Sequence, residues 1–456
     1  MANVFLILTA YSIMKVLRES LVLVAGGVDA RAASAAAQAL LLLGAVPLYG
    51  AIASRVPRRL LINAVTGFFV ACIAGFYGLR LLGVSVGIFF YIWLGIFNVM
   101  VIAQFWSFAN DVYTAEEGKR LFPLVAFGGA SGAVIGAWLP GKLIAAVGVS
   151  QLLLVAGAML IFGAVLSNVV DARERRRTEA AVPDVRTTGS LPAATSQLRM
   201  ATGEFRVPSD DYQDASGSYA ALRPVRPGQP VAAAEPEPRS TGSAFQLVLR
   251  SRYLLLIALL VLFLNWVNTT GENILAAFVS QRAAFTAADP AAAEAMAGQF
   301  YSNYQATVNL VTMLLQLFVV SRALKYLGVG ASLLVLPVVA FAAYGLIAFV
   351  PVLAAVRWAK TAENSTDYSL NNTARQALFL PTTREEKYKG KQAVDSFFQR
   401  AGDVMAAATW FGGTKLVGLA FNQLALVNLV LVAAWLAVAA AIGRRYRRLL
   451  AVAEGG

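Results

Sequence analysis

The chain has 456 residues, of which 58% are hydrophobic and only 14% are charged, with a formal net charge of +13. This composition excludes a soluble globular protein and predicts an integral membrane protein. The sequence has no histidine and a single cysteine, Cys72, which excludes a histidine metal site, a histidine proton relay and a disulfide within the chain. We therefore expect no metal and no cofactor.

The first apolar segment, residues 4–25, contains charged side chains in its middle, in the stretch KVLRES. Lys15, Arg18 and Glu19 fall on one side of a helix, and each would cost roughly 2.5–3.5 kcal/mol if it faced lipid at mid-bilayer. We interpret this side as the wall of a water-filled cavity. The alternative is that the two bases reach a headgroup region while Glu19 neutralises Arg18.

Apolar runs long enough to cross about 30 Å of hydrocarbon recur along the chain, and we count about twelve. Because a membrane-spanning segment must pair its backbone groups internally, the predicted fold is all-α, a polytopic membrane protein. The predicted spans are residues 4–25, 33–54, 60–82, 86–108, 121–147, 150–170, 253–279, 300–322, 329–350, 352–380, 391–418 and 420–442.

Basic residues gather in alternate loops, most clearly in ARERRR at 172–177 and RRYRR at 444–448. The positive-inside rule then places these loops and both termini in the cytoplasm, which requires an even number of spans. We therefore predict a multi-pass protein of the inner (cytoplasmic) membrane that contacts the lipid bilayer, and we expect a monomer. Because the charge follows the loops, we do not assign it to nucleic acid binding.

Residues 171–243 are rich in Pro, Ala, Ser and Gly and have no apolar period. Such a segment cannot bury enough surface to offset the entropy of ordering, so we predict a disordered cytoplasmic linker. It separates a six-helix half at residues 1–170 from a second six-helix half at 244–456. This organisation is typical of a transporter made of two parallel halves.

The fourth span ends in FWSFANDVYTAEEGKR, which places Asp111 at the membrane boundary. An acidic pair followed by basic residues occurs at the start of the fifth and eleventh spans, in EEGKRLFP at 116–123 and EEKYKGKQAVD at 385–395. These loops would suit a cytoplasmic gate of ion pairs between the halves. The alternatives are two ordinary solvated loops and, around Asp111, an ordinary polar helix end.

The seventh span carries Asn268 and Glu272, and we expect Gly271 to loosen the helix beside the carboxylate. A glutamate within a membrane is more often functional than not, because a neutral side chain would pack there at lower cost. The tenth span has polar side chains at three- and four-residue spacing, so it must be surrounded by protein and water.

The first, fourth, seventh, tenth and eleventh spans together give one set of candidate site residues. We predict that substrate is bound by Lys15, Arg18, Asn268, Asn372, Arg375 and Lys391, and that gating or coupling involves Glu19, Asp111, Glu272, Asp367, Asp395 and Arg400. Guanidinium and ammonium groups in a low-dielectric cavity suit a multiply charged oxyanion such as phosphate. Nearby carboxylates can pair with these bases when the cavity is empty.

Three stretches resemble the non-mitochondrial ATP/ADP translocases of plastids and intracellular bacteria: KVLRESLVLV, FWSFANDVYTAEEGKRLFPL and YSLNNTARQALFLPTTREEKYKGKQAVD. The likeness in order and hydropathy covers nearly the whole chain. It implies twelve helices in a major-facilitator-like arrangement and exchange of nucleotides across the membrane.

The resemblance places Arg18 and Glu19 where the family has Lys and Asp, and it places Arg375 at a lysine of the tenth helix. It also matches Asp111, the tripeptide at 389–391 and Asp395 to family positions. Two acids of the family's tenth helix are replaced here, by Asn372 and Gln376. Because the anion-binding basic positions match the family better than the rest of the site does, the resemblance favours a phosphate-bearing substrate over any particular nucleotide.

The leading hypothesis is a secondary antiporter that exchanges ATP/ADP-like nucleotides or other phosphorylated anions by alternating access around a central basic site. The sequence has no G-x-x-x-x-G-K-[ST] motif, so transport should not be driven by ATP hydrolysis. One alternative is a proton-coupled carrier of another organic anion or lipid, with Glu272 or Glu19 as proton carrier. A further alternative is a non-transporting scaffold or sensor that docks partners through the linker. We predict no enzymatic activity, because no cluster of catalytic acids and no nucleophile with a base is visible.

Overall fold

The computed structural model describes residues 1–53, 55–56, 58–112, 115–181, 244–383 and 385–455, and within 106–112 and 115–123 it describes the helical backbone alone. Every regular element in this described part is a helix, which confirms the all-α fold. Seven of the described helices are long and apolar enough to cross a membrane. The protein is therefore a multi-pass membrane protein, and the count of twelve crossings stays a prediction.

The N-terminal half contains four long helical elements, two of which fold back on themselves. They are α1 (Ala2–Ala53), α2 (Arg58–Leu81), α3 (Gly87–Val112) and α4 (Ala115–Ala181). The backbone leaves helical geometry at Gly27 in α1 and at Gly148 in α4, where φ is 65° and 81°, a region that glycine enters without a steric penalty. As a result, each of these elements forms two arms.

Contacts between the two arms show how sharply α1 turns back. Arg31 Nε donates a hydrogen bond to Glu19 Oε2 at 2.8 Å across a separation of 12 residues. A straight helix would place these residues about 18 Å apart along its axis. The turn at Gly27 therefore brings charged residues of both arms to one depth.

The C-terminal half continues with α6 (Ala244–Arg250), α7 (Arg252–Thr286), α8 (Pro290–Leu315), the π-helical turn η1 (Gln316–Val320), α9 (Ser321–Tyr326) and α10 (Gly328–Phe349). The predicted tenth span is formed by α11 (Leu353–Thr366), the π-helical turn η2 (Asp367–Asn371) and α12 (Asn372–Ala377). The predicted eleventh span is η3 (Glu386–Gly390), α13 (Lys391–Ala393), η4 (Val394–Phe398), α14 (Gln399–Phe411) and η5 (Gly412–Val417), and α15 (Phe421–Gly455) follows. The polar tenth and eleventh spans are therefore interrupted by π-helical turns. Such turns are frequent at functional sites.

Some boundaries differ from the prediction. The eighth predicted span begins at 300, but α8 begins at Pro290, because Asp289 caps the helix by accepting a hydrogen bond from the Ala292 amide at 2.7 Å. Hydropathy misses this start because the segment PAAAEAMAG is only weakly apolar. α4 continues to Ala181, so residues 171–181, predicted as the start of the linker, are helical. The rest of the predicted linker, residues 182–243, lies outside the described residues.

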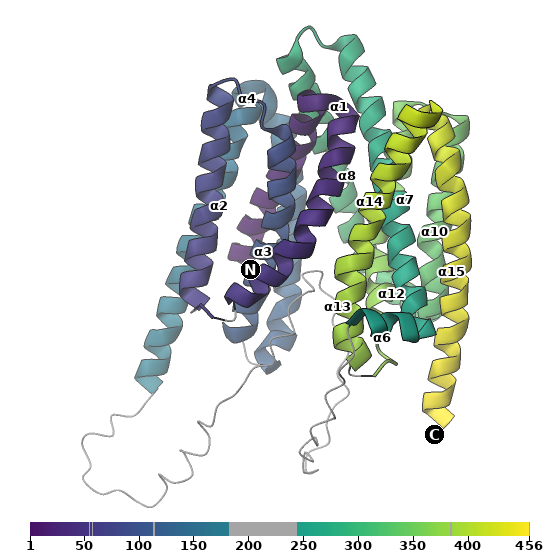
Figure 1. Cartoon of the computed structure of the whole chain (residues 1–456). Helices are drawn as coiled ribbons and strands as arrows, with labels where there is room; N and C mark the ends of the chain where they lie inside the picture. The colour runs from purple at the N-terminus through teal and green to yellow at the C-terminus, as the bar shows by residue number, and fades with distance from the viewer. Residues whose placement is uncertain (54, 57, 113–114, 182–243, 384, 456) are drawn as a thin grey trace, which may run out of the picture.

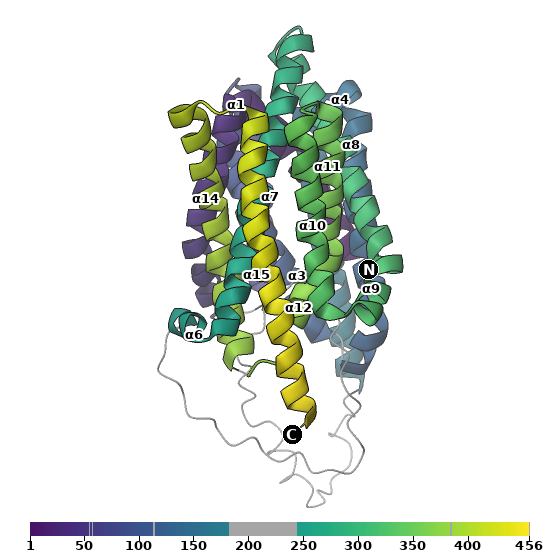
Figure 2. The same ribbon diagram turned by 90° about the vertical axis from the view of Figure 1, so that its right-hand side faces the viewer.

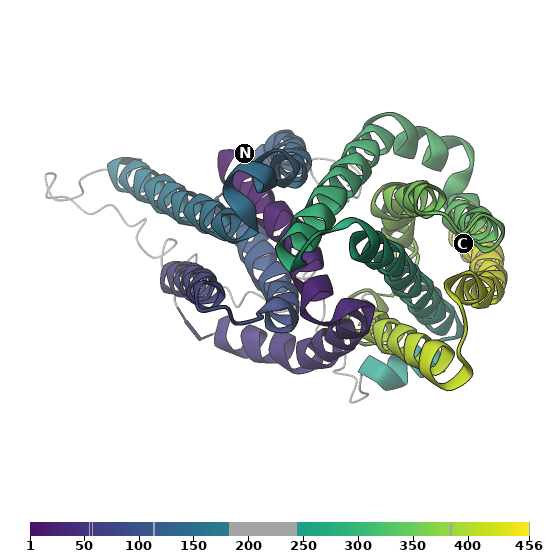
Figure 3. The same ribbon diagram turned by 90° about the horizontal axis from the view of Figure 1, so that it is seen from above.

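The long helices run side by side along one common direction, and the short helix α6 lies across them at one end of the bundle (Figures 1 and 2). Seen from above, α1 to α4 gather on one side and the helices from α7 to α15 gather on the other (Figure 3). Each half has its own apolar core, and α1 and α4 pack against α7, α8 and α14 across the boundary. We call the end of the bundle that contains Ala181 and Ala244 the linker end, and the opposite end the far end.

Candidate functional site

Six charged side chains form one connected cluster where the two arms of α1 meet α7 and α11. We call this cluster the inter-half network. Its members are Arg18, Glu19 and Arg31 from the N-terminal half, and Glu272, Lys360 and Glu363 from the C-terminal half.

The N-terminal part of the network is a carboxylate held between two guanidinium groups. Arg18 Nε donates to Glu19 Oε1 at 2.9 Å, and Arg31 Nε donates to Glu19 Oε2 at 2.8 Å. The Arg18 guanidinium also lies 4.3 Å from the centroid of the Tyr91 ring, in a cation–π contact. The prediction that this face of the first helix avoids lipid agrees with this geometry, and Glu19 does neutralise Arg18 as the alternative interpretation expected.

Arg31 connects the two halves. Its Nη1 donates to Asn273 Oδ1 at 2.5 Å, and its Nη2 lies 3.8 Å from Glu272 Oε2. The other oxygen of Glu272 lies 3.7 Å from Lys360 Nζ and accepts a hydrogen bond from Asn364 Nδ2 at 2.8 Å. Glu272 therefore lies between a cation of its own half and a cation of the opposite half.

The C-terminal part of the network is buried around Lys360, whose side chain has no exposed surface. Lys360 Nζ donates to Glu363 Oε2 at 2.8 Å and to Asn268 Oδ1 at 3.0 Å, and the Tyr344 hydroxyl donates to Glu363 Oε2 at 3.0 Å. A Cβ atom on Gly271 would lie 2.0 Å from the Tyr344 hydroxyl oxygen. The expectation that Gly271 loosens the helix is wrong, because α7 is continuous there and the glycine instead makes room for this cluster.

Lys15 is the basic residue of the first helix that lacks a carboxylate partner. Its Nζ lies 5.3 Å from the centroid of the Tyr368 ring in the opposite half, and it makes no ion pair with the described part of the chain. The Tyr368 side chain is 42% exposed although it lies in the middle of the tenth span. An anion between the halves could therefore approach Lys15 without displacing a carboxylate.

The tenth-span residues nearer the linker end form a second group. Asp367 accepts a hydrogen bond from Asn371 Nδ2 at 2.8 Å, and Arg375 Nε is buried without a partner among the described residues. Arg375 follows Lys360 by 15 residues, so it lies about 22 Å further along the helix by helical rise. Arg375 is therefore well removed in depth from Lys360, while the half-buried Asn372 lies about one helical turn from Tyr368, whose ring contacts Lys15.

The remaining predicted residues are spread along the eleventh and fourth spans. Arg400 lies 3.5 Å from Asp403, which accepts a hydrogen bond from Thr269 at 2.7 Å. Lys391 and Asp395 are half-buried on α13 and η4, nearer the linker end. The side chain of Asp111 and those of the loop at 116–123 lie outside the described part, so the predicted cytoplasmic gate stays a prediction.

The predicted site residues omit Glu363 and the two bases that complete the network, Arg31 and Lys360. Arg31 lies between the first two predicted spans, where a basic residue is typical of a solvated turn. Lys360 was recognised only as one of many polar residues in the tenth span. A signal was available in both cases, since an acidic residue within a membrane needs a basic partner and Glu272 had none in its own predicted span.

The halves are also joined at the far end, outside the network. Arg80 Nη2 lies 2.7 Å from Glu294 Oε1, and Lys415 Nζ lies 2.7 Å from Asp29 Oδ2. Ser302 on α8 accepts a hydrogen bond from the amide of Gly141 on α4 at 2.7 Å. The two ion pairs tie α1 and α2 to the C-terminal half at this end. The Ser302 contact ties α4 to α8 nearer the depth of the network, since Ser302 is two residues before Tyr304, whose hydroxyl donates a hydrogen bond to Glu272 at 3.1 Å.

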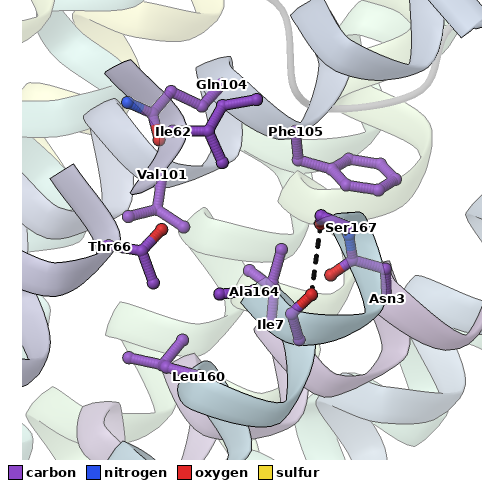
Figure 4. Close-up of a pocket in the computed structure, with 11 residues that line it drawn as sticks. Asn3, Ile7, Ile62, Thr66, Val101, Gln104, Phe105, Leu160, Ala164 and Ser167 are labelled. Carbon is purple, nitrogen blue, oxygen red and sulfur yellow. Dashed lines mark hydrogen bonds between the residues drawn. The ribbon is translucent and has the colours of Figure 1, made fainter. Parts of the chain in front are cut away.

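A small pocket lies within the N-terminal half, between α1, α2, α3 and α4 (Figure 4). Its wall is mostly apolar and includes Ile7, Ile62 and Leu160, while Asn3 donates a hydrogen bond to Ser167 at one side. No member of the inter-half network lines this pocket. We therefore place the candidate site at the boundary between the halves.

Two helical halves meet around buried charges in a chain of membrane-spanning helices, and solved structures show that this is a major-facilitator-like fold. The chain is similar to a solved structure of the nucleoside transporter NupG, with 10% identity over 96% of this chain and 98% of that chain and a TM-score of 0.58. It is also similar to a bacterial homologue of the iron transporter ferroportin in an inward-facing state, with 12% identity over 97% of each chain and a TM-score of 0.59. A bacterial homologue of the human lysosomal transporter Spinster, inward-facing and unoccupied, matches with 12% identity over 98% and 97% of the two chains and a TM-score of 0.56.

No protein-family model matches the sequence, and no curated protein matches it. At such low identity, the likeness to solved transporters shows the fold alone. The narrower resemblance to ATP/ADP translocases stays a prediction.

Proposed function

We propose that the protein is a secondary transporter that exchanges phosphorylated anions, with nucleotides as the leading candidates, across the cytoplasmic membrane. It works by alternating access of a site between the two halves, and the linker end faces the cytoplasm. No cofactor, metal or enzymatic step is part of this proposal.

The observation that carries the proposal is the pair of bases on the first helix, Lys15 and Arg18. Lys15 contacts an exposed tyrosine ring and no carboxylate of the described chain, while the Arg18 side chain is 14% exposed and bonded through Nε and Nη2 to one oxygen of Glu19. Lys15 therefore presents positive charge toward the opposite half, and Arg18, one helical turn away, keeps part of its side chain accessible. A phosphoryl group accepts hydrogen bonds from guanidinium and ammonium groups, which makes a phosphorylated anion the substrate class that fits.

The depth of Arg375 changes how substrate contact is divided. Arg375 lies about 22 Å along the tenth span from Lys360, but only seven residues, about 10 Å of helical rise, from Tyr368, whose ring Lys15 contacts. We propose that Lys15 and Arg18 bind the phosphoryl groups, and that Arg375, Asn372 and Lys391 meet the anion nearer the linker end as it enters. Asn268 is engaged by Lys360 and contributes by positioning that ammonium group.

The test is an exchange assay with the purified full chain in liposomes loaded with ADP, ATP or inorganic phosphate. We expect uptake of labelled ADP only when the vesicles contain a phosphorylated counter-substrate, with no dependence on a proton gradient. A double replacement of Lys15 and Arg18 by Gln should abolish uptake, while replacement of the exposed Lys325 by Gln at the surface should not.

The principal competing function is a proton-coupled carrier of another organic anion or lipid. Glu272 supports this alternative, because its side chain is 16% exposed and lies between two cations at 3.7 and 3.8 Å. If uptake required an imposed pH gradient and ignored internal ADP, ATP and phosphate, the exchange proposal would be replaced by this one.

A further inference from the structure

The inter-half network divides its charge unequally between the two halves. On the N-terminal side, the guanidinium groups of Arg18 and Arg31 surround one carboxylate, Glu19, which leaves one net positive charge. On the C-terminal side, the ammonium of Lys360 lies between the carboxylates of Glu272 and Glu363, which leaves one net negative charge. Lys15 adds a further positive charge to the N-terminal side.

The net positive N-terminal side and the net negative C-terminal side of the network attract each other across the boundary and hold the halves together. Glu19, Arg31 and Glu363 have side chains that are 2%, 4% and 1% exposed, so water screens their charges poorly. Opening the far end at this depth separates Arg31 from Glu272, so each half loses the attraction of the opposite net charge. This loss disfavours opening while the site is empty.

We propose that the substrate's own negative charge removes this attraction, and that Arg31 is the positioning residue that links substrate binding to opening of the far end. This inference rests on the proposed transport of anions and explains why an empty carrier would not reorient. An anion bound to Lys15 and Arg18 neutralises the N-terminal side. Arg31 then stays with Glu19, while Glu272 stays with Lys360, and the halves can part.

The geometry provides each partner with an alternative, as this exchange requires. Arg31 already bonds Glu19 at 2.8 Å, against 3.8 Å to Glu272, so losing Glu272 leaves it paired. Lys360 lies 3.7 Å from Glu272 and can close on it when Arg31 leaves. This predicts selectivity for anions. An uncharged molecule of the same shape would not neutralise the N-terminal side, so the halves would stay together and it would not be transported.

The experiment measures opening of the far end with a single cysteine. Ser302 lies on α8, faces α4 and has no exposed surface. In a Cys72→Ser background, Ser302→Cys should therefore react slowly with a membrane-impermeant thiol reagent added at the far side. ADP added to the parent should accelerate this labelling. Arg31→Gln should label at least about fivefold faster than the parent without ADP, the lower range of typical coupling between sites, and should respond little to ADP. Arg31→Lys should restore slow labelling, because it keeps the charge.

Two further variants separate charge balance from simple contact. Glu363 contacts Lys360 and Tyr344, both in its own half, yet Glu363→Gln should speed labelling because it makes the C-terminal side neutral. Lys360→Gln should slow labelling, because it makes that side more negative. If the network were merely structural, both variants would loosen the boundary or neither would.

The matched control is Arg80→Gln, which breaks another ion pair between the halves at the far end but lies outside the network. Labelling of this variant should still be accelerated by ADP. The inference is overturned if Glu363→Gln labels like the parent, or if Lys360→Gln labels faster than the parent. If labelling of the parent does not change with ADP or phosphate, while the charge variants still follow the expected order, nucleotide exchange is contradicted. The inference that opposite net charges hold the halves together is then retained.

Discussion

At the scale of single residues, the neighbouring bases Arg18 and Lys15 have different contact partners. Arg18 is bonded to Glu19 and lies over Tyr91, whereas Lys15 faces a ring of the opposite half. A base that is already paired keeps a fixed orientation, and a base without a carboxylate keeps its charge available. The pair therefore combines a positioned guanidinium with an ammonium group that pairs with no carboxylate among the residues that the structure describes.

Replacement of Arg18 tests the positioned guanidinium. We expect Arg18→Gln to weaken ADP binding by about 1.5–3 kcal/mol, roughly tenfold to a hundredfold, because a hydrogen bond to a charged group is lost. Arg18→Lys should retain part of the affinity, since the charge remains and the planar fork is lost. Binding is measured by scintillation proximity or calorimetry on purified protein, and parent-like affinity in Arg18→Gln would remove Arg18 from the site.

Replacement of Glu272 distinguishes an exchanger from a proton-coupled carrier. We expect Glu272→Gln to raise efflux without external counter-substrate relative to exchange, because the C-terminal side of the network loses its net charge. The ratio of efflux to exchange should change little with external pH. If the variant instead exchanges normally but loses uptake driven by a pH gradient, Glu272 carries protons.

At the scale of elements, the charged cluster depends on where side chains are missing as much as on where they are present. Gly271 leaves space for the Tyr344 hydroxyl and for Lys360 Nζ, which would lie 2.0 and 3.1 Å from an added Cβ atom. The tenth span changes to π-helical geometry at Asp367–Asn371, a turn that includes the exposed Tyr368. Both departures from a regular apolar helix occur next to the site.

The packing at Gly271 leads to a stability prediction. We expect Gly271→Ala to lower the free energy of unfolding by about 1–3 kcal/mol, because the new methyl group overpacks a filled site. The control is Gly75→Ala, where an added Cβ has no heavy atom within 4 Å and the gain in helix propensity is about 1 kcal/mol. Thermal unfolding in detergent measures both variants, and equal midpoints would contradict the packing at Gly271.

At the scale of the whole molecule, the two halves are linked by buried charges at mid-depth and by two further ion pairs at the far end. Such a boundary is more polar than an apolar core, which would suit the proposed separation of the halves during transport. The apolar outer surface, with side chains such as Phe89, Phe162 and Val430 each more than half exposed, suits contact with lipid.

Orientation in the membrane is tested by labelling from each side. With Cys72 replaced, cysteines introduced at Ala180 and Ala453 should react with an impermeant thiol reagent from the cytoplasmic side only, because the basic clusters lie in the same loops. Reaction of either cysteine from outside would overturn the proposed orientation and the cytoplasmic linker with it.

The linker separates transport from a scaffold or sensor role. Deletion of residues 184–240 should leave ADP exchange within about twofold of the parent, since linkers between domains tolerate changes in length at a small entropic cost. Loss of exchange, in a variant that still unfolds at the parent's temperature, would assign the linker an active part.

The sequence by itself determined the membrane class and the all-helical fold, because long apolar runs leave a membrane protein few ways to satisfy its backbone. It also indicated that Lys15, Arg18, Glu19 and Glu272 avoid lipid, since the cost of exposing a charge there depends on residue type and depth alone.

Only the tertiary structure decided which charges meet. Arg31 joins Glu19 because α1 turns back at Gly27, and it reaches Glu272 because α1 packs against α7. Spacing along the chain predicts neither contact. The first depends on the turn at Gly27, and the residues of the second belong to different halves. Conversely, Arg18 and Arg375 look alike in the sequence, but the tenth span carries Arg375 away in depth. Pairing between helices depends on packing and on the direction of turns, and these are properties of the folded molecule.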